Sequence, residues 1–145
     1  MKTHKSLRTR TKTLGKRKRL QYFKEFAASQ DKRHHLSKFD RQWMKQVDMI
    51  MLRELHSSEF HMDQLAGELA FCRRQCERRM KKITGMTPSW YLRTMRLLIA
   101  NAMLRSGEYV SVKEVARKVG FASCPHFSKV YKDHFEVAPS AVLHT

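Results

Sequence analysis

Tight-turn residues and long apolar runs are scarce in this chain of 145 residues. It contains only 5 glycines and 3 prolines, too few for the many turns of an all-β fold. No apolar run approaches the ~20 residues that a membrane-spanning helix needs. The basic N-terminus has no apolar segment behind it, so a secretory signal is not expected, and the acid-free first 24 residues lack the amphipathic stripe of a transit peptide. The chain is therefore expected to be all-α, without a membrane partner.

Catalytic and metal-binding patterns are missing as well. The 3 cysteines form no disulfide framework, which fits a reducing cytoplasm. The 8 histidines are scattered, and no glycine-rich phosphate loop, serine elbow or pair of carboxylates occurs. Neither enzymatic activity nor a cofactor is expected. Cys72 and Cys76 at i and i+4, with Cys124 and His126 elsewhere, leave structural zinc as an alternative.

Acidic residues are also few. The chain has 30 Lys and Arg against 13 Asp and Glu, a net charge of +17, which predicts a polyanionic partner such as nucleic acid or an anionic membrane. Residues 1–35 alone hold 12 basic and 2 acidic residues, a net of +10. Residues 1–38 are accordingly predicted to form a basic, partly disordered arm, with residues 1–18 as a solvated tail. The alternatives are a phosphate-contacting arm or the remnant of a linker from a missing upstream domain.

The rest of the chain contains an internal repeat. LAGELAF (residues 65–71) aligns with VARKVGF (residues 115–121), which places the two alanines 50 residues apart. After one extra residue the spacing becomes 51, so that Pro88 aligns with Pro139. Each copy reads as a short helix, a tight turn, a second helix and a proline stop. The chain is therefore predicted to hold two helix–turn–helix subdomains joined by a long helix.

The joining segment, residues 88–105, has clear helix boundaries. Thr87 can cap it, Pro88 fits its first turn and Gly107 can end it. Its apolar positions predict one stripe with a second set beside it: Tyr91, Met95, Leu98 and Ala102, then Leu92, Ile99 and Met103. Such a helix must be packed on both flanks. The predicted division is a first unit over residues 39–87, a linker helix over residues 88–106 and a second unit over residues 107–145.

The first unit is predicted to contain three helices. Asp40 can cap the first, which runs to residue 55 with one buried face: Trp43, Val47, Ile50, Met51 and Leu55. The second covers residues 62–70 and buries Leu65, Ala66 and Leu69. The third covers residues 73–84 and ends at Gly85, with three inward residues: Cys76, Met80 and Ile83.

The second unit shows the same order of signals. Ser111 and Glu114 form a capping box before a helix with these buried residues: Val112, Val115, Ala116 and Val119. Gly120 supplies the turn, and Ser123 can cap the next helix, in whose first turn Pro125 is tolerated. The inward residues of that helix are Phe127, Val130, Tyr131 and Phe135.

Basic and hydrogen-bonding side chains gather on the outward face of the second helix in each unit. The first copy begins at Arg73 and presents Arg74, Glu77, Arg78 and Lys81, while the second presents Ser128, Lys129 and Lys132. Arg can hold guanine O6 and N7 with two hydrogen bonds, Glu can accept from cytosine N4, and Lys binds phosphate. A single basic helix is usually a solvated face, but its repetition favours DNA. The same alignment puts Cys76 in the core position of Phe127, which disfavours zinc.

The length of the linker helix fits this interpretation. A helix of 18 residues is ~27 Å long, and successive major grooves on one face of B-DNA lie ~34 Å apart. With the helix widths added, one monomer can place two recognition helices in adjacent grooves. Because the two outward faces differ, the expected target is asymmetric rather than palindromic.

Several motifs together resemble one known family. They are the Leu-Ala pair at residues 65–66, R-x-x-x-x-R-x-M-K-x-x-x-G-x-T-P at residues 73–88, Tyr91-Leu92, Arg96-Leu97, Ala100, Val115-Ala116, Val119-Gly120-Phe121, Phe127-Ser128-Lys129, Tyr131-Lys132 and residues 135–139. Residues 60–142 thereby resemble the DNA-binding domain of AraC/XylS-type bacterial transcription regulators. The resemblance implies two helix–turn–helix units that read adjacent major grooves.

The resemblance also implies roles for single residues. Arg74, Glu77 and Arg78 would face bases in the first unit, and four residues would do so in the second: Cys124, Pro125, Ser128 and Lys129. Because Cys124 and Pro125 offer few donors, the second unit is expected to contribute more affinity than specificity. The sequence departs from the family at four positions: Cys72 for a capping Ser, Cys76 for Leu, Glu136 for Gly and Val142 for Tyr. The two cysteines lead us to expect a less stable first unit.

The sequence thus predicts a sequence-specific, double-stranded DNA-binding transcription regulator of the bacterial cytoplasm, not an enzyme. KRKRLQYFKEF (residues 16–26) resembles the linker that follows a receiver domain, so a missing sensory or receiver domain and RNA polymerase are further candidate partners. Two alternatives remain. A non-specific nucleic-acid-binding protein would explain the charge without the repeat, and a protein-interaction module would use the exposed methionines and aromatic residues.

Overall fold

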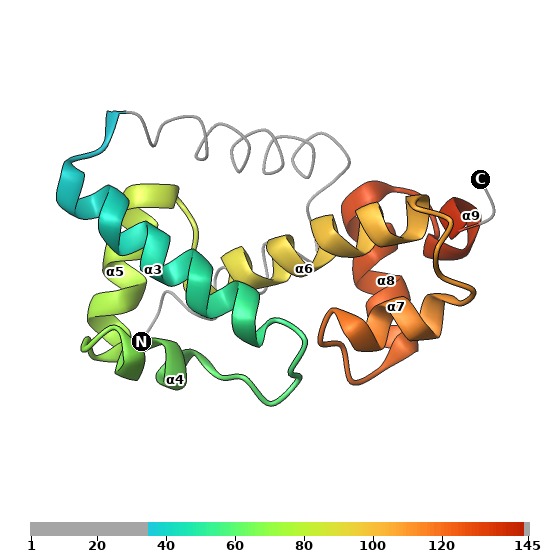
Figure 1. The fold of residues 1–145 in the computed structure, drawn as a ribbon, viewed down its shortest axis with the longest axis horizontal. Helices are drawn as coiled ribbons and strands as arrows, with labels where there is room; N and C mark the ends of the chain where they lie inside the picture. The colour runs from blue at the N-terminus through green and yellow to red at the C-terminus, as the bar shows by residue number, and fades with distance from the viewer. Residues whose placement is uncertain (1–34, 144–145) are drawn as a thin grey trace.

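The computed structural model describes residues 35–143, and within them it contains helices and turns but no strand (Figure 1). The helices are α3 (Lys38–Glu54), α4 (Met62–Glu68), α5 (Arg73–Thr84), α6 (Pro88–Arg105), α7 (Val112–Lys118), α8 (Cys124–Phe135) and α9 (Pro139–Leu143). The predicted all-α class, with two helix–turn–helix units and a long joining helix, is confirmed for this part of the chain. The predicted basic arm lies outside the described residues up to residue 34.

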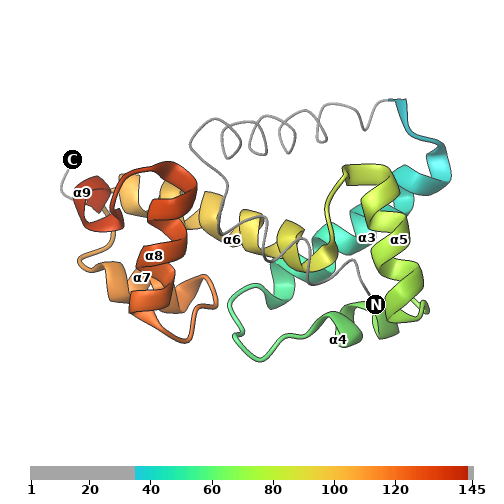
Figure 2. The same cartoon turned by 180° about the vertical axis from the view of Figure 1, so that it is seen from behind.

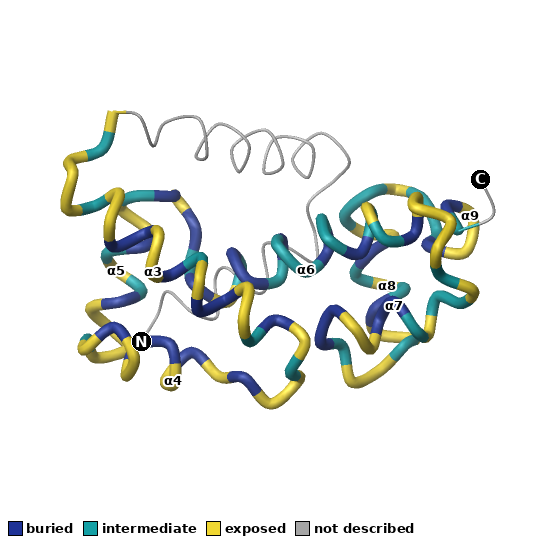
Figure 3. Tube along the Cα trace, viewed as in Figure 1, coloured by how far each residue is buried: buried dark blue, intermediate teal, exposed yellow. Residues whose placement is uncertain are grey.

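The long helix α6 runs through the middle of the molecule and carries one unit at each end (Figures 1 and 2). Helices α3, α4 and α5 surround its N-terminal half, while α7, α8 and α9 surround its C-terminal half. Helix α6 packs against α5 toward its N-terminal end and against α7 and α9 toward its C-terminal end. The tube in Figure 3 shows buried segments along α6 and on the inner faces of both units.

Local signals set the ends of α6 where the sequence predicts them. The Thr87 side-chain oxygen accepts a hydrogen bond from the Trp90 amide at 3.3 Å, and Pro88 occupies the first turn. After the helix, Gly107 adopts φ 75°, a left-handed conformation that costs glycine little. Residues 88–105 are therefore helical, as predicted.

The predicted apolar stripe of α6 is only partly right. The buried residues of this helix are Pro88, Tyr91, Leu92, Thr94, Leu97, Ala100 and Leu104. Ala102 is exposed, and four predicted members are half-buried: Met95, Leu98, Ile99 and Met103. The stripe rule assumes one packing partner on one side. Helix α6 has different partners at its two ends, so its buried face turns along the axis.

Helix α3 begins at a different cap from the predicted one. The Ser37 hydroxyl accepts a hydrogen bond from the Asp40 amide at 3.1 Å, so Ser37 is the cap and Asp40 lies in the first turn. The carboxylate of Asp40 instead pairs with Arg79 at 3.0 Å. The predicted buried face of this helix is confirmed at all five positions: Trp43, Val47, Ile50, Met51 and Leu55.

The two helix–turn–helix units have matching lengths and matching turns. Helices α4 and α7 have 7 residues each, and α5 and α8 have 12 each. The predicted core residues Cys76, Met80, Phe127 and Tyr131 are buried, whereas Ile83, Val112, Val130 and Phe135 are only partly buried. Helix α4 ends at Glu68, two residues before the predicted end, because the turn toward α5 already begins at Leu69.

Three polar side chains fasten α6 to its neighbours. The Tyr91 hydroxyl donates to Asp48 of α3 at 2.8 Å, and the Tyr131 hydroxyl of α8 donates to Asn101 of α6 at 2.7 Å. Near the middle of the helix, Arg96 donates two hydrogen bonds to main-chain carbonyls beyond the end of α3. Each unit is therefore tied to α6 by buried apolar surface and by at least one directional hydrogen bond.

Candidate nucleic-acid interface

Helix α5 presents a polar face because its opposite face belongs to the core. Cys76 and Met80 are almost completely buried, with exposures of 1% and 0%. At the start of the helix, the Gln75 side chain accepts a hydrogen bond from the Cys72 amide at 3.1 Å. At its end, Gly85 adopts φ 76° and its amide donates back to Lys81. The caps fix the two ends of the helix, and the burial of Cys76 and Met80 leaves its basic side facing solvent.

Three of the predicted residues on α5 are cations without an ion pair in the part of the chain that the structure describes. Arg74, Arg78 and Lys81 are exposed, and no ion pair within residues 35–143 involves any of them. Arg73 differs, because its guanidinium contacts Glu77 at 3.1 Å and Asp63 at 3.7 Å. The structure thus brings all five predicted residues of the first unit onto one face. Three of them carry uncompensated charge, and Arg73 and Glu77 form an ion pair.

Arg79 lies in the same helix but has a structural place. Its guanidinium stacks over the rings of Phe39 and Trp43, at 4.6 and 4.8 Å from the centroids, and pairs with Asp40. Stacking of this kind combines cation–π attraction with apolar contact. Arg79 therefore joins α5 to α3 and is not available on the outward face.

Helix α8 presents the equivalent face in the second unit. The Ser123 hydroxyl accepts a hydrogen bond from the His126 amide at 3.3 Å, which caps the helix as predicted. With the repeat spacing of 51 residues, Lys129 corresponds to Arg78 and Lys132 to Lys81. Both lysines and Pro125 are exposed, whereas Cys124 and Ser128 are half-buried.

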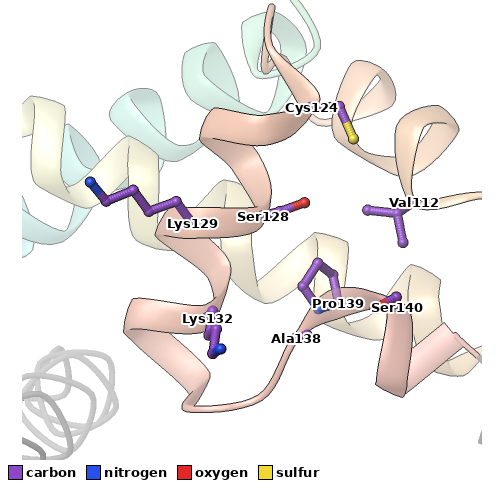
Figure 4. Close-up of a pocket in the computed structure, with 8 residues that line it drawn as sticks. All are labelled: Val112, Cys124, Ser128, Lys129, Lys132, Ala138, Pro139 and Ser140. Carbon is purple, nitrogen blue, oxygen red and sulfur yellow. The ribbon is translucent and has the colours of Figure 1, made fainter.

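The half-buried residues lie beside a hollow of about 450 Å³ between α7, α8 and α9. It is lined by Val112, Cys124, Ser128, Lys129, Lys132, Ala138, Pro139 and Ser140. In Figure 4, Cys124 and Ser128 point toward Val112, while Lys129 extends to the other side of α8. The structure therefore brings four of the predicted second-unit residues to one hollow: Cys124 and Ser128, which are half-buried, and Lys129 and Lys132, which are exposed. Pro125 is exposed and does not line it.

The hollow adds Ser140 to the candidate residues, a position that the sequence analysis did not single out. Its hydroxyl lies at the start of α9, beside the same hollow as Lys132. The internal repeat could have identified this residue. Pro139 aligns with Pro88, so Ser140 aligns with Ser89. A residue that recurs after the proline stop in both copies is worth testing as a polar contact.

The cysteines do not assemble a metal site in the described part of the chain. No group of three or more His, Cys, Asp or Glu side chains within residues 35–143 is arranged to hold an ion. Burial raises the pKa of the Cys76 thiol to about 11, so this sulfur stays protonated at neutral pH. Cys72, the cap of α5, is exposed.

Comparison with known proteins identifies the double unit. A family model described as a helix-turn-helix domain matches residues 65–145, more than half of the chain. The fold is similar to the crystal structure of an AraC-type transcriptional regulator from Chromobacterium violaceum, with 28% identity and a TM-score of 0.64 over 74% of this chain and 95% of that one. The chain belongs to the AraC-type helix-turn-helix family. This is a family of DNA-binding transcriptional regulators rather than of enzymes.

Other AraC-type proteins are similar over the same region. The transcriptional regulator GbdR of Pseudomonas aeruginosa is 36% identical over 96 residues, which cover 66% of this chain and 26% of that protein. The transcriptional activator RhaS of Escherichia coli is 33% identical over 91 residues, 63% of this chain and 32% of that protein. The chain thus spans about a quarter to a third of the length of these curated relatives.

One similar AraC-type domain has been solved together with DNA. It is the DNA-binding domain of the global transcriptional factor AdpA in complex with a target DNA. The two chains share 32% identity and a TM-score of 0.62, over 68% of this chain and 86% of that one. Among the described residues of the present chain, no helix is both long and apolar enough to cross a membrane.

Proposed function

We propose that this AraC-type domain binds double-stranded DNA sequence-specifically, with α5 and α8 in adjacent major grooves of an asymmetric site. One observation carries the proposal: exposed cations occupy equivalent positions on two matched helices that lie at opposite ends of one long helix. They are Arg78 and Lys81 on α5, and Lys129 and Lys132 on α8. Helix α6 is ~27 Å long, close to the groove-to-groove repeat of ~34 Å once the helix widths are added.

The two helices have different tasks in this proposal. Arg74 and Arg78 have free guanidinium groups that can hold guanine with two hydrogen bonds. Glu77 accepts from cytosine N4, and its ion pair with Arg73 limits the rotamers of both side chains. Lys81 and Lys132, one turn further along their helices, bind backbone phosphates.

In this proposal helix α8 contacts fewer base edges than α5 and contributes mainly sequence-independent affinity for DNA. Cys124 and Pro125 lack strong donors, and Ser128 is half-buried beside the hollow, so the main outward groups of α8 are its two exposed lysines, Lys129 and Lys132. Because α5 and α8 present unlike groups, the two half-elements of the DNA site differ in sequence. The site has no two-fold symmetry, and one protein monomer occupies it.

The chain acts by binding rather than by catalysis in this proposal, and it meets its DNA in the bacterial cytoplasm. Its relatives are longer proteins, so a sensory or receiver domain is proposed as the partner that controls binding. RNA polymerase is the proposed downstream partner, since the curated relatives are transcriptional regulators and activators.

Selection of bound duplexes from a random pool tests the proposal directly. We expect enrichment of one asymmetric motif with two elements about one helical turn apart. A pool with single-stranded RNA serves as the control for general polyanion binding. Uniform recovery of all duplexes would overturn sequence-specific recognition, and a palindromic motif would overturn the one-monomer arrangement.

A further inference from the structure

Three segments meet at one point between the two helix–turn–helix units. They are the C-terminal end of α3, the middle of α6 and the turn that joins α7 to α8. At this point Gly120 is buried, and a Cβ on it would stand only 2.0 Å from the carbonyl oxygen of Leu55. The same Cβ would stand 2.9 Å from the terminal guanidinium nitrogen of Arg96. We name Leu55, Arg96 and Gly120 the junction.

Arg96 supplies the hydrogen bonds of the junction. Its Nε donates to the Leu55 carbonyl at 2.9 Å and its Nη2 to the Ser57 carbonyl at 2.8 Å. The last carbonyls of a helix have no partner within the helix, and the C-terminal end carries partial negative charge. Leu55 is the C-cap of α3, and the Ser57 carbonyl lies in the turn that follows, where it also accepts from the Phe60 amide at 3.4 Å. One guanidinium contacts both carbonyls at once, which an ammonium on a flexible stem does less well. Arg96 thereby joins α6 to the end of α3.

Gly120 brings the turn between α7 and α8 of the second unit against the same carbonyl of Leu55. A positive φ alone does not explain the glycine, because Ala70 occupies the equivalent turn of the first unit at φ 57°. Gly85 and Gly107 have φ values of 76° and 75°, and a Cβ on either would meet nothing within 4 Å. Gly120, at φ 87°, is the one of these three glycines whose missing side chain makes room for another segment.

We propose that Arg96 and Gly120 are positioning residues that hold the two helix–turn–helix units at one fixed relative angle. Helix α6 sets the distance between α5 and α8, and the junction sets the rotation of one unit against the other. In this way the junction determines which spacing and helical phase of the two half-elements the protein accepts. The DNA part of this inference rests on the proposed function, while the orientation part does not.

Gly120→Ala is the direct test, and Gly107→Ala is its matched control. Both substitutions place a Cβ on a residue of positive φ, but only the first meets the end of α3. Residual dipolar couplings of the amides measure the relative orientation of the units in solution. We expect one alignment tensor for both units in the wild type and in Gly107→Ala, and two different tensors in Gly120→Ala.

The DNA arm uses the selected duplex and versions with one base pair added or removed between the elements. One base pair rotates the second element by about 34–36° around the DNA axis. We expect the wild type and Gly107→Ala to reject the altered spacings. Gly120→Ala should lose about tenfold in affinity for the selected duplex, because the effective concentration of the second unit falls. Its preference among the three spacings should shrink to less than about threefold for the same reason.

Arg96→Lys repeats both measurements without adding bulk, and it decides the question if Gly120→Ala does not fold. Two tensors in the wild type, or one unchanged tensor in the folded junction variants, would overturn the proposal. Unchanged spacing preference in variants with two tensors would overturn its DNA part. If the wild type selects no duplex, the proposed function fails, yet the dipolar couplings still decide whether the junction fixes the angle.

Discussion

The two helix–turn–helix units share their helix lengths and turns but differ in their surface charge and in their core side chains. Helix α5 carries six basic residues and one acidic residue, a net of +5, whereas α8 carries two and one, a net of +1. Their cores differ in the opposite sense. The first unit buries Cys76 and Met80 where the second buries Phe127 and Tyr131. At these equivalent positions the first unit therefore has sulfur-containing side chains inside and more charge outside, whereas the second has aromatic rings inside and less charge outside.

The aromatic core of the second unit is continuous. Phe121, Phe127, Tyr131 and Phe135 contact one another in sequence, edge-on or tilted, with ring centroids 5.1, 5.6 and 4.6 Å apart. Such pairs add to the stabilisation from buried area. The repeat therefore shows that the helix–turn–helix backbone accepts different core side chains, provided that the turn and the lengths of the two helices are kept.

The core difference predicts the largest effect. Phe127→Ala removes a fully buried ring and should lower the free energy of unfolding by about 3–5 kcal/mol. Cys76→Ala, at the equivalent position, removes one sulfur atom and should cost about 1 kcal/mol. Chemical denaturation followed by circular dichroism measures both. Equal losses would show that the two cores contribute alike.

The linking helix predicts the next effect. Two alanines inserted near the middle of α6 rotate one recognition helix by ~200° relative to the other at 3.6 residues per turn. The affinity for the selected duplex should fall by about 100-fold or more, because the two units no longer bind together. Four alanines, which add nearly one full turn, provide the comparison. Specific binding that survives the two-residue insertion, measured by competition gel shifts, would contradict the role of α6 as a spacer.

The charge difference predicts that some residues determine base preference and others contribute only affinity for DNA. Arg78→Ala should cost about 1–3 kcal/mol in binding and relax the preference at one base position. Lys132→Ala should weaken binding evenly across sequences and lower the salt slope by about 1. Repeating the duplex selection and the salt titration with each variant measures both effects. An unchanged base preference in Arg78→Ala would remove this residue from base reading.

A smaller difference concerns pH. Burial lowers the pKa of His134 from 6.5 to about 4, while the equivalent position of the first unit holds Ile83. His134 stays neutral in the folded protein, so the unfolded state binds more protons once the pH falls below its own pKa. Stability is therefore lost progressively as the pH falls from about 6.5 toward 4. Between pH 7.5 and 5.5 the loss should be about 1 kcal/mol.

His134→Ile, which copies the first unit, should remove this pH dependence. Thermal unfolding at the two pH values measures the change, with His126→Gln as the control, since His126 is exposed. An equal pH dependence in the wild type and in His134→Ile would assign the effect to other groups.

Much of this architecture follows from short-range signals in the sequence. The ends of α5 and α6 are where Gly85, Thr87 and Pro88 indicate, because caps and turns involve residues only a few positions apart. The buried face of α3 follows from helical periodicity, since that helix packs on one side. The cap at Ser37 was missed because Asp40 is an equally good capping residue and the sequence alone does not choose between them.

The predictions were less accurate where segments distant in the sequence pack against the same helix. The buried face of α6 departs from a single stripe because each end packs against another unit. The hollow that Cys124, Ser128, Lys129 and Lys132 share depends on α9, which the sequence marked only by the proline that ends the second copy of the repeat. The five candidate residues on α5, by contrast, share one face as helical spacing requires.

By itself, the sequence determined that this protein is helical, that it contains two helix–turn–helix units and where their cationic faces lie. These properties depend on caps, turns and periodicity over a few residues. Only the tertiary structure decided how one unit is fixed against the other. Arg96 contacts Leu55 across 41 positions of the chain, and Gly120 reaches the same carbonyl from the other unit. In the sequence, a glycine in a turn indicates only that the backbone can adopt a positive φ. Only the fold shows which other segment packs against that glycine.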